Sequence, residues 1–141
     1  MATSEDEDPF DFGGEGNAAL DTIDASLHDE GWATHYTTRR GLRTWFAVAE
    51  KRWADSDTVD DYTNDVCARD ALELALGRSH GALHDRLAAL IARADQEFLA
   101  STKPDTDRLL EGFLRIDAED GWWWRRIPSD GAVIEELRAS R

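Results

Sequence analysis

The chain has 141 residues, of which 30 are acidic and 16 basic, and its formal net charge is −14. This length fits one domain, and 41% hydrophobic residues with six tryptophans can build a core, which excludes a multidomain enzyme and a fully disordered chain. The longest apolar runs, residues 45–49 and 87–92, are far shorter than the roughly 20 residues of a membrane helix. Residues 1–30 have no Lys or Arg and no apolar stretch typical of secretory or transit signals. We therefore expect no membrane span and a cytoplasmic location.

The acidic charge is concentrated at the N-terminus. Residues 1–30 hold ten acidic side chains and no basic one, whereas the other 111 residues hold 20 acids and 16 bases. Residues 1–16 combine an acidic run with Pro9 and three glycines, a composition typical of disordered segments. We therefore expect a disordered acidic arm over residues 1–16, followed by a single helical domain over residues 17–141.

Two aromatic side chains, Phe10 and Phe12, lie among the carboxylates of this arm. The simplest interpretation is a solvated terminal tail. In a second interpretation the arm is a docking peptide, whose phenylalanines fill pockets on a partner while the carboxylates face a basic rim. If the arm is instead ordered against Arg39, Arg43 or Arg126 of the same chain, its role is internal.

Apolar residues recur at helical spacing through most of residues 17–101, and four helices are predicted there from this spacing and from capping residues. The expected helices run from Asn17 to Gly31, from Thr37 or Thr38 to Ala54, from the end of residues 55–57 to Gly77, and from Ser79 to about Ser101.

Residues 102–141 give weaker signals. Asp105 or Thr106 can cap a fifth helix, and a short last helix is expected after residues 128–130. Between them, residues 122–127 are predicted to form an extended segment packed on helices, because no second strand is available to pair with it. The whole sequence therefore predicts an all-α protein, a compact bundle of about five or six helices.

Opposite charges predict that the second and third helices are antiparallel neighbours. Residues 35–53 carry a net charge of +4 and residues 54–77 carry −6. The basic stretch includes Trp45 and Trp53, a mixture that also occurs in nucleic-acid-binding proteins, but the acidic total charge opposes contact with phosphates. We expect no direct nucleic-acid binding.

His80 and His84 have the i, i+4 spacing that places two imidazoles on one helix face, as in half of a metal site. A zinc-protease helix requires Glu directly after the first His, where this chain has Gly81, and the spacing supplies no third ligand. The sequence also contains no phosphate-binding loop after a strand and no nucleophile signature. We therefore assign no catalytic residue, no metal ligand and no cofactor, and we favour a role other than catalysis.

The most unusual motif is Trp122-Trp123-Trp124-Arg125-Arg126. In an extended segment its side chains alternate, so that one side enters the core, where Arg stacks on Trp. This structural interpretation is favoured; the motif is also a candidate binding surface, because Trp and Arg are enriched at interface hot spots. The candidate partner-binding residues are Phe10, Phe12, Trp122, Trp123, Trp124, Arg125 and Arg126.

These observations favour a small acidic protein that acts as a protein–protein interaction module, of the immunity, inhibitor or regulator type, and binds a basic partner. Electrostatic attraction between opposite charges speeds such an encounter. Two alternatives remain: a metal-binding helical-bundle enzyme that uses His80 and His84, and a structural subunit whose tryptophans complete a homo-oligomer.

Overall fold

The computed structural model describes residues 10–50 and 58–139. These residues form five α-helices, two short 3₁₀-helices and one two-stranded sheet, so the predicted all-α fold is confirmed. The α-helices are α1 (Gly13–Asp29), α2 (Thr38–Glu50), α3 (Val59–Arg78), α4 (Gly81–Ser101) and α5 (Ala132–Ala139); the 3₁₀-helices are η2 (Leu109–Gly112) and η3 (Trp122–Arg125); the strands are β1 (Thr102–Pro104) and β2 (Arg126–Pro128).

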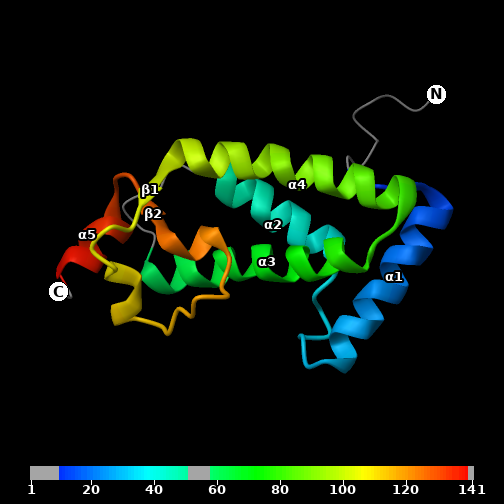
Figure 1. The fold of residues 1–141 in the computed structure, drawn as a ribbon, viewed down its shortest axis with the longest axis horizontal. Coiled ribbons are helices and arrows are strands. Elements are labelled where there is room, and N and C mark those ends of the chain that lie inside the picture. The colour runs from blue at the N-terminus through cyan, green and yellow to red at the C-terminus, as the bar shows by residue number, and fades with distance from the viewer. Residues whose placement is uncertain (1–9, 51–57, 140–141) are drawn as a thin grey trace.

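Helix α2 is the centre of the bundle and packs against both α3 and α4. Helices α2 and α4 run in the same direction and α3 runs opposite to them, as the charge pattern predicts for α2 and α3 (Figure 1). Helix α1 crosses one end of this trio, and the small sheet, the 3₁₀-helices and α5 cover the other end. None of the described helices is long and apolar enough to cross a lipid bilayer.

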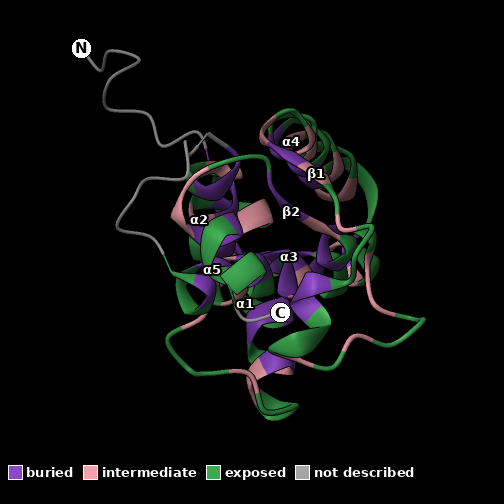
Figure 2. Cartoon of the chain, turned by 90° about the vertical axis from the view of Figure 1, so that its left-hand side faces the viewer, coloured by how far each residue is buried: buried purple, intermediate pink, exposed green. Residues whose placement is uncertain are grey.

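The core is aromatic where the three central helices meet. Trp45 of α2 and Phe98 of α4 are fully buried, with ring centroids 4.7 Å apart. Tyr62 of α3 is also fully buried, and its hydroxyl donates a 2.6 Å hydrogen bond to the carbonyl of Arg126 in β2. Figure 2 shows the buried segments facing one another across the bundle, with exposed segments on the outside.

Side-chain caps explain where α2 and α3 begin. Thr58 and Asp61 form a capping box at the start of α3, each side chain accepting the other residue's backbone N–H. The Thr37 hydroxyl accepts the N–H of Arg40 in the first turn of α2. Asp24, buried on α1, accepts both the N–H and the hydroxyl of Thr38, at 2.9 and 2.7 Å, and so ties α1 to the start of α2.

The N-terminal boundary differs from the prediction. Residues 1–9 of the expected disordered arm lie outside the described residues, but residues 10–16 belong to the folded body. Phe10 is buried against Phe46, and α1 begins at Gly13, four residues before the predicted N-cap. The Asn17 side chain turns back instead and accepts the N–H of Phe12, while Asp11 accepts the N–H of Gly13. These polar contacts offset the poor helix propensity of the adjacent glycines.

Two predictions for the C-terminal third were wrong. Residues 126–128 do have a partner strand, because β1 pairs with β2 in antiparallel register, with Lys103 opposite Ile127. The expected fifth helix after Asp105 is reduced to the 3₁₀-helix η2. Asp105 does cap it, accepting the N–H groups of Leu109 and Leu110, but Arg108 at φ 55 breaks regular helix at the start.

The turn before η3 requires glycine for steric reasons. A Cβ at Gly121 would lie 2.2 Å from the indole ring of Trp123, which is buried. We expect Gly121→Ala to lower the free energy of unfolding by about 1–3 kcal/mol, as overpacking does. The matched control is Gly77→Ala, where a Cβ meets no atom within 4 Å; in helix α3 this change should be neutral or stabilising by up to about 1 kcal/mol. Urea unfolding measures both, and equal stability of the two variants would contradict the steric argument.

Candidate functional site

The tryptophan motif is folded differently from the predicted extended segment. Trp122–Arg125 form the 3₁₀-helix η3, and β2 begins only at Arg126. A 3₁₀-helix has about three residues per turn, so neighbouring side chains need not point to opposite sides. Trp123 and Trp124 are therefore both buried, while Trp122 keeps 38% of its surface exposed and contacts the ring of Phe98.

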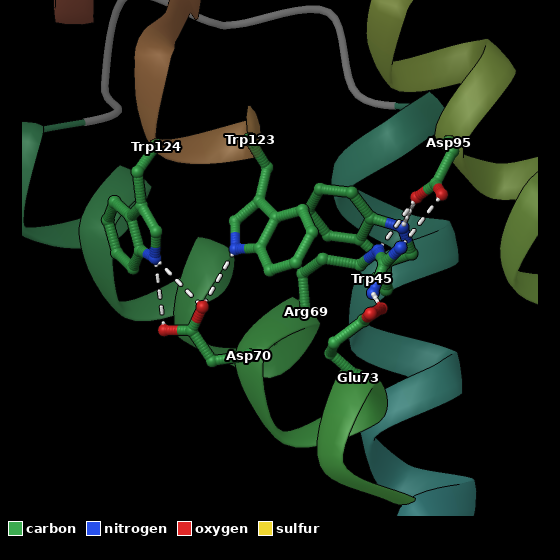
Figure 3. Close-up of polar contacts among 7 residues, drawn as sticks. All are labelled: Trp45, Arg69, Asp70, Glu73, Asp95, Trp123 and Trp124. Atoms are coloured by element: carbon green, nitrogen blue, oxygen red, sulfur yellow. Dashed lines mark hydrogen bonds and ion pairs between the residues drawn. The ribbon is translucent and has the colours of Figure 1, made fainter. Parts of the chain in front are cut away.

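Asp70 of α3 holds the two buried tryptophans in place. Its carboxylate accepts the indole N–H of Trp123 at 2.8 Å and that of Trp124 at 2.9 Å (Figure 3). Burial raises the pKa of Asp70 above its usual value, and the two indole N–H groups oppose that shift. The N–H groups of both rings are thus satisfied inside the protein, as buried polar groups require.

Arg69, the neighbour of Asp70, extends the same network to α4. Its guanidinium lies over the ring of Trp123, 4.2 Å from the centroid, and donates two hydrogen bonds to the carboxylate of Asp95, at 2.9 and 3.0 Å. Asp95 also accepts the indole N–H of Trp45 at 2.9 Å, and the remaining guanidinium nitrogen binds Glu73 (Figure 3). The network therefore joins α2, α3, α4 and η3.

Sequence reasoning missed Arg69, Asp70 and Asp95, although one signal was present. Arg69 is the single basic residue among the seven acids of residues 54–77. A lone cation in an acidic helix is a candidate for a buried ion pair, because charged side chains are rarely buried without a partner. Each of the three guanidinium nitrogens of Arg69 and each of the indole N–H groups of Trp45, Trp123 and Trp124 has a carboxylate partner, so the network is equipped for structural support.

The two arginines of the motif also make contacts within the chain. Arg125 is exposed, yet its guanidinium donates to the carbonyls of Asp117 and Asp120. Arg126 donates to the hydroxyl and carbonyl of Thr102, where α4 passes into β1. The predicted stacking of arginine on tryptophan does occur, but the arginine is Arg69 of another element.

The two phenylalanines of the predicted docking peptide differ in burial and in the arginine that each contacts. Phe10 is buried, with the guanidinium of Arg43 5.9 Å from its ring centroid. Phe12 is half-buried, and Arg86 of α4 lies over its ring at 4.7 Å. Phe10 is therefore ordered against Arg43 of the same chain, which is the internal role that the sequence analysis gave as an alternative to docking.

The histidine pair is split by the start of α4. His80 is the N-cap residue and is exposed, whereas the Nδ1 atom of His84 lies 3.0 Å from the carbonyl of Leu76 and 3.1 Å from the hydroxyl of Ser79. The Ser79 hydroxyl itself donates to that carbonyl, so Ser79 ends α3 and does not cap α4 as predicted. Within residues 10–50 and 58–139, no three His, Cys, Asp or Glu side chains are grouped as a metal site would require.

A cleft of about 870 Å³ lies where α1 faces the turn between α3 and α4. Its apolar lining comes from α1 and the residues before it on one side and from the first turn of α4 on the other. The charged side chains at the cleft are Glu15, Arg78 and Arg86, with His80 beside them. Its lining residues are Phe12, Glu15, Gly16, Ala19, Thr22, Ile23, Arg78, Ser79, His80, Gly81, Ala82, Leu83 and Arg86.

Comparisons of the chain with models of protein families, with curated proteins and with solved structures returned no match.

The ion pair between Arg69 and Asp95 is expected to dominate the stability of the network. Asp95→Ala removes two of the three hydrogen bonds of the buried Arg69 guanidinium and leaves the Trp45 indole without its acceptor, which should cost about 3–5 kcal/mol. In the matched control Glu73→Ala, the lost partner is 53% exposed, and the cost should stay below about 1 kcal/mol. Urea unfolding compares the two, with Asp95→Asn as a milder variant if the alanine variant does not fold. Similar losses from Asp95→Ala and Glu73→Ala would contradict this role.

Asp70 is expected to make stability depend on pH. Because its pKa is raised in the folded state, the folded protein binds more protons than the unfolded chain at pH values from the usual 3.8 up to the raised value. The contribution of Asp70 to stability therefore falls as pH rises through this window. The Asp70→Asn variant keeps an oxygen acceptor for the indoles but has no titratable group at this position. Its free energy of unfolding minus that of the wild type should therefore increase with pH and then level off. Urea unfolding from about pH 3 to about pH 7 tests this, and a constant difference would contradict it.

Proposed function

We propose that the protein is a protein–protein interaction module, of the immunity, inhibitor or regulator type, that binds a basic partner protein in the cytoplasm. The observation that carries the proposal is the separation of charge along the chain. Residues 1–30 contain ten acids and no Lys or Arg, while the rest of the chain is nearly balanced. Such a one-signed segment attracts a partner of opposite charge over a distance and speeds association.

The described part of this segment presents its charge to solvent. Of its six acidic side chains, Asp24 is buried as a cap for α2, and the other five are exposed. Glu30 is paired with Arg78, at 2.6 Å. The segment thus has an acidic surface along α1 and at the residues just before it, formed by Asp11, Glu15, Asp21 and Asp29. The sequence adds four more acids at residues 5–8.

The tryptophan motif carries less of the proposal than the sequence suggests. Trp123 and Trp124 are buried, and both arginines donate to carbonyls of the chain. Of the seven candidate partner-binding residues, two keep aromatic surface that is accessible to a partner: Phe12 is half-buried and Trp122 is exposed. The proposed contact surface is the N-terminal acidic segment with Phe12, because Phe12 follows Asp11 in that segment whereas Trp122 belongs to η3.

The test neutralises the acids that precede the folded body. A deletion must stop at residue 9, because Phe10 is part of the core, so substitution is cleaner. The partner is isolated by copurification, and its affinity for a variant with Glu5→Gln, Asp6→Asn, Glu7→Gln and Asp8→Asn is measured at several salt concentrations. We expect at least about tenfold weaker binding and a weaker salt dependence.

The matched control removes the same charge elsewhere. The control variant carries four amide substitutions at exposed acids of the body and leaves the N-terminal segment intact: Glu97→Gln, Glu119→Gln, Asp130→Asn and Glu135→Gln. Binding by this control should change by less than about threefold, since screening limits distant charges. Equal losses in both variants, no loss in either, or a partner without a basic surface would overturn the proposed function.

A further inference from the structure

The two phenylalanines before α1 pack on α2 and α4, each beside an arginine. Phe10 is buried against Phe46 of α2, with the ring centroids 5.3 Å apart, and the guanidinium of Arg43 lies 5.9 Å from the Phe10 centroid. Phe12 is half-buried, and the guanidinium of Arg86 on α4 lies 4.7 Å from its centroid. Each ring is thus paired with an arginine of a different helix, so that cation–π attraction adds to apolar burial.

The carboxylate between the two rings has the same basic surroundings. Asp11 is exposed, and its pKa lies below the usual value. Hydrogen bonds from the side chain of Asn17 and from the N–H of Gly13 lower this pKa most. The positive charges of Arg39 on α2 and Arg86 on α4 lower it further. Arginines of both helices therefore stabilise the ionised carboxylate.

These contacts have the chemistry of a peptide-binding site. Phe46 supplies an apolar seat, and Arg39, Arg43 and Arg86 supply a basic rim; we call these four residues of α2 and α4 the arginine surface. Arginine clusters recognise acidic peptide motifs in many complexes, and aromatic anchors add affinity. In the free chain, the chain's own N-terminal segment takes the place of such a motif.

The link between residues 10–12 and the body is weak in sequence. Gly13, Gly14 and Gly16 occupy three of the first four positions of α1, and among the residues glycine has the lowest helix propensity after proline. No atom lies within 4 Å of a Cβ placed on Gly14, so packing does not require glycine there. The N-cap residue, Phe12, has no capping side chain. The segment can therefore leave α2 and α4 at the cost of the first turn of α1 and the burial of one phenylalanine.

From this arrangement we infer that the arginine surface is a docking site for an acidic–aromatic peptide segment of a partner protein. That segment has two aromatic side chains separated by one acidic residue, as residues 10–12 have, and residues 10–12 close the site in the free chain. A partner segment binds only to chains whose own segment has left, so the fraction of open chains scales the measured affinity. The inference does not rest on the proposed function, in which a basic partner contacts the acidic segment and not the arginines.

The test adds the chain's own segment as a separate peptide. The first fluorescent probe has the sequence of residues 5–14, the second has alanine in place of both phenylalanines, and the third has the amide in place of every acid. The opened variant, Phe10→Ala with Phe12→Ala, keeps the arginine surface and loses both internal rings. In fluorescence anisotropy, the first probe should bind this variant at least about tenfold more tightly than it binds wild type, because the internal segment no longer competes. The second and third probes should each bind the opened variant at least about tenfold more weakly than the first.

Arginine substitutions locate the site. In wild type, Arg86→Gln would weaken the internal and the external contact together, so these substitutions are made in the opened variant. There, Arg43→Gln with Arg86→Gln should weaken binding of the first probe at least about tenfold. The matched control, Arg108→Gln with Arg115→Gln, removes the same charge at exposed positions outside the arginine surface. Its affinity should stay within about threefold, since screening limits distant charges.

Thermal unfolding confirms that each variant is folded. If the opened variant does not fold, Phe12→Ala alone takes its place, with an expected gain of at least about threefold over wild type. Equal binding of the first probe to wild type and to the variant overturns the closure of the site by residues 10–12. Equal binding of the three probes, equal losses from the two arginine pairs, or no binding of the first probe overturns the docking site itself.

Discussion

The buried pair of Arg69 and Asp95 is the contact on which the arrangement of the bundle depends. Burying a guanidinium and a carboxylate carries a large desolvation penalty, which is offset only by good geometry and full hydrogen bonding. Both conditions hold here, with two parallel hydrogen bonds, a tryptophan ring under the guanidinium and an indole N–H on the carboxylate. Any shift of α4 along α3 would leave one of these groups unpaired, so the pair fixes the register of the two helices.

Two consecutive residues of α3 carry out two different tasks. Arg69 reaches α4, and Asp70 turns toward η3 and holds the indoles of Trp123 and Trp124. The chain between α4 and α5 contains little regular structure, with strands of three residues and 3₁₀-helices of four. Its position is therefore determined by specific polar contacts, to Asp70 and to the C-terminal end of α4, more than by the periodicity of an element.

The predictable part of the fold is the part with a repeating pattern. The central helices could be predicted because Leu and aromatic residues recur at helical spacing and, for α2, because Thr37 caps the first turn. The strand β1 could not, because Thr102–Pro104 is too short to show alternation and pairs with residues 22 to 26 positions further along the chain. The structure of residues 122–124 could not be predicted for a related reason, because three consecutive tryptophans show no periodicity. The choice between strand and 3₁₀-helix depends on hydrogen-bond acceptors such as Asp70, which lies on another helix. Phe10 was assigned to the disordered arm because the prediction rests on the average composition of residues 1–16. Acids and glycines dominate that average, so a single aromatic residue does not change it.

The use of the tryptophan motif inside the body changes which surface is available for recognition. Aromatic and arginine side chains make strong interface contacts only when they are accessible and not already paired, and most of the motif fails that condition. Of the candidate residues, Phe12 beside the acidic helix α1 and Trp122 of η3 keep accessible aromatic surface, and they lie toward opposite ends of the bundle. Charge alone would attract any cationic surface, because Coulomb forces act over the Debye length and do not distinguish shapes. Under the proposed function, selectivity among basic partners therefore requires short-range contacts of matching shape beside the charge.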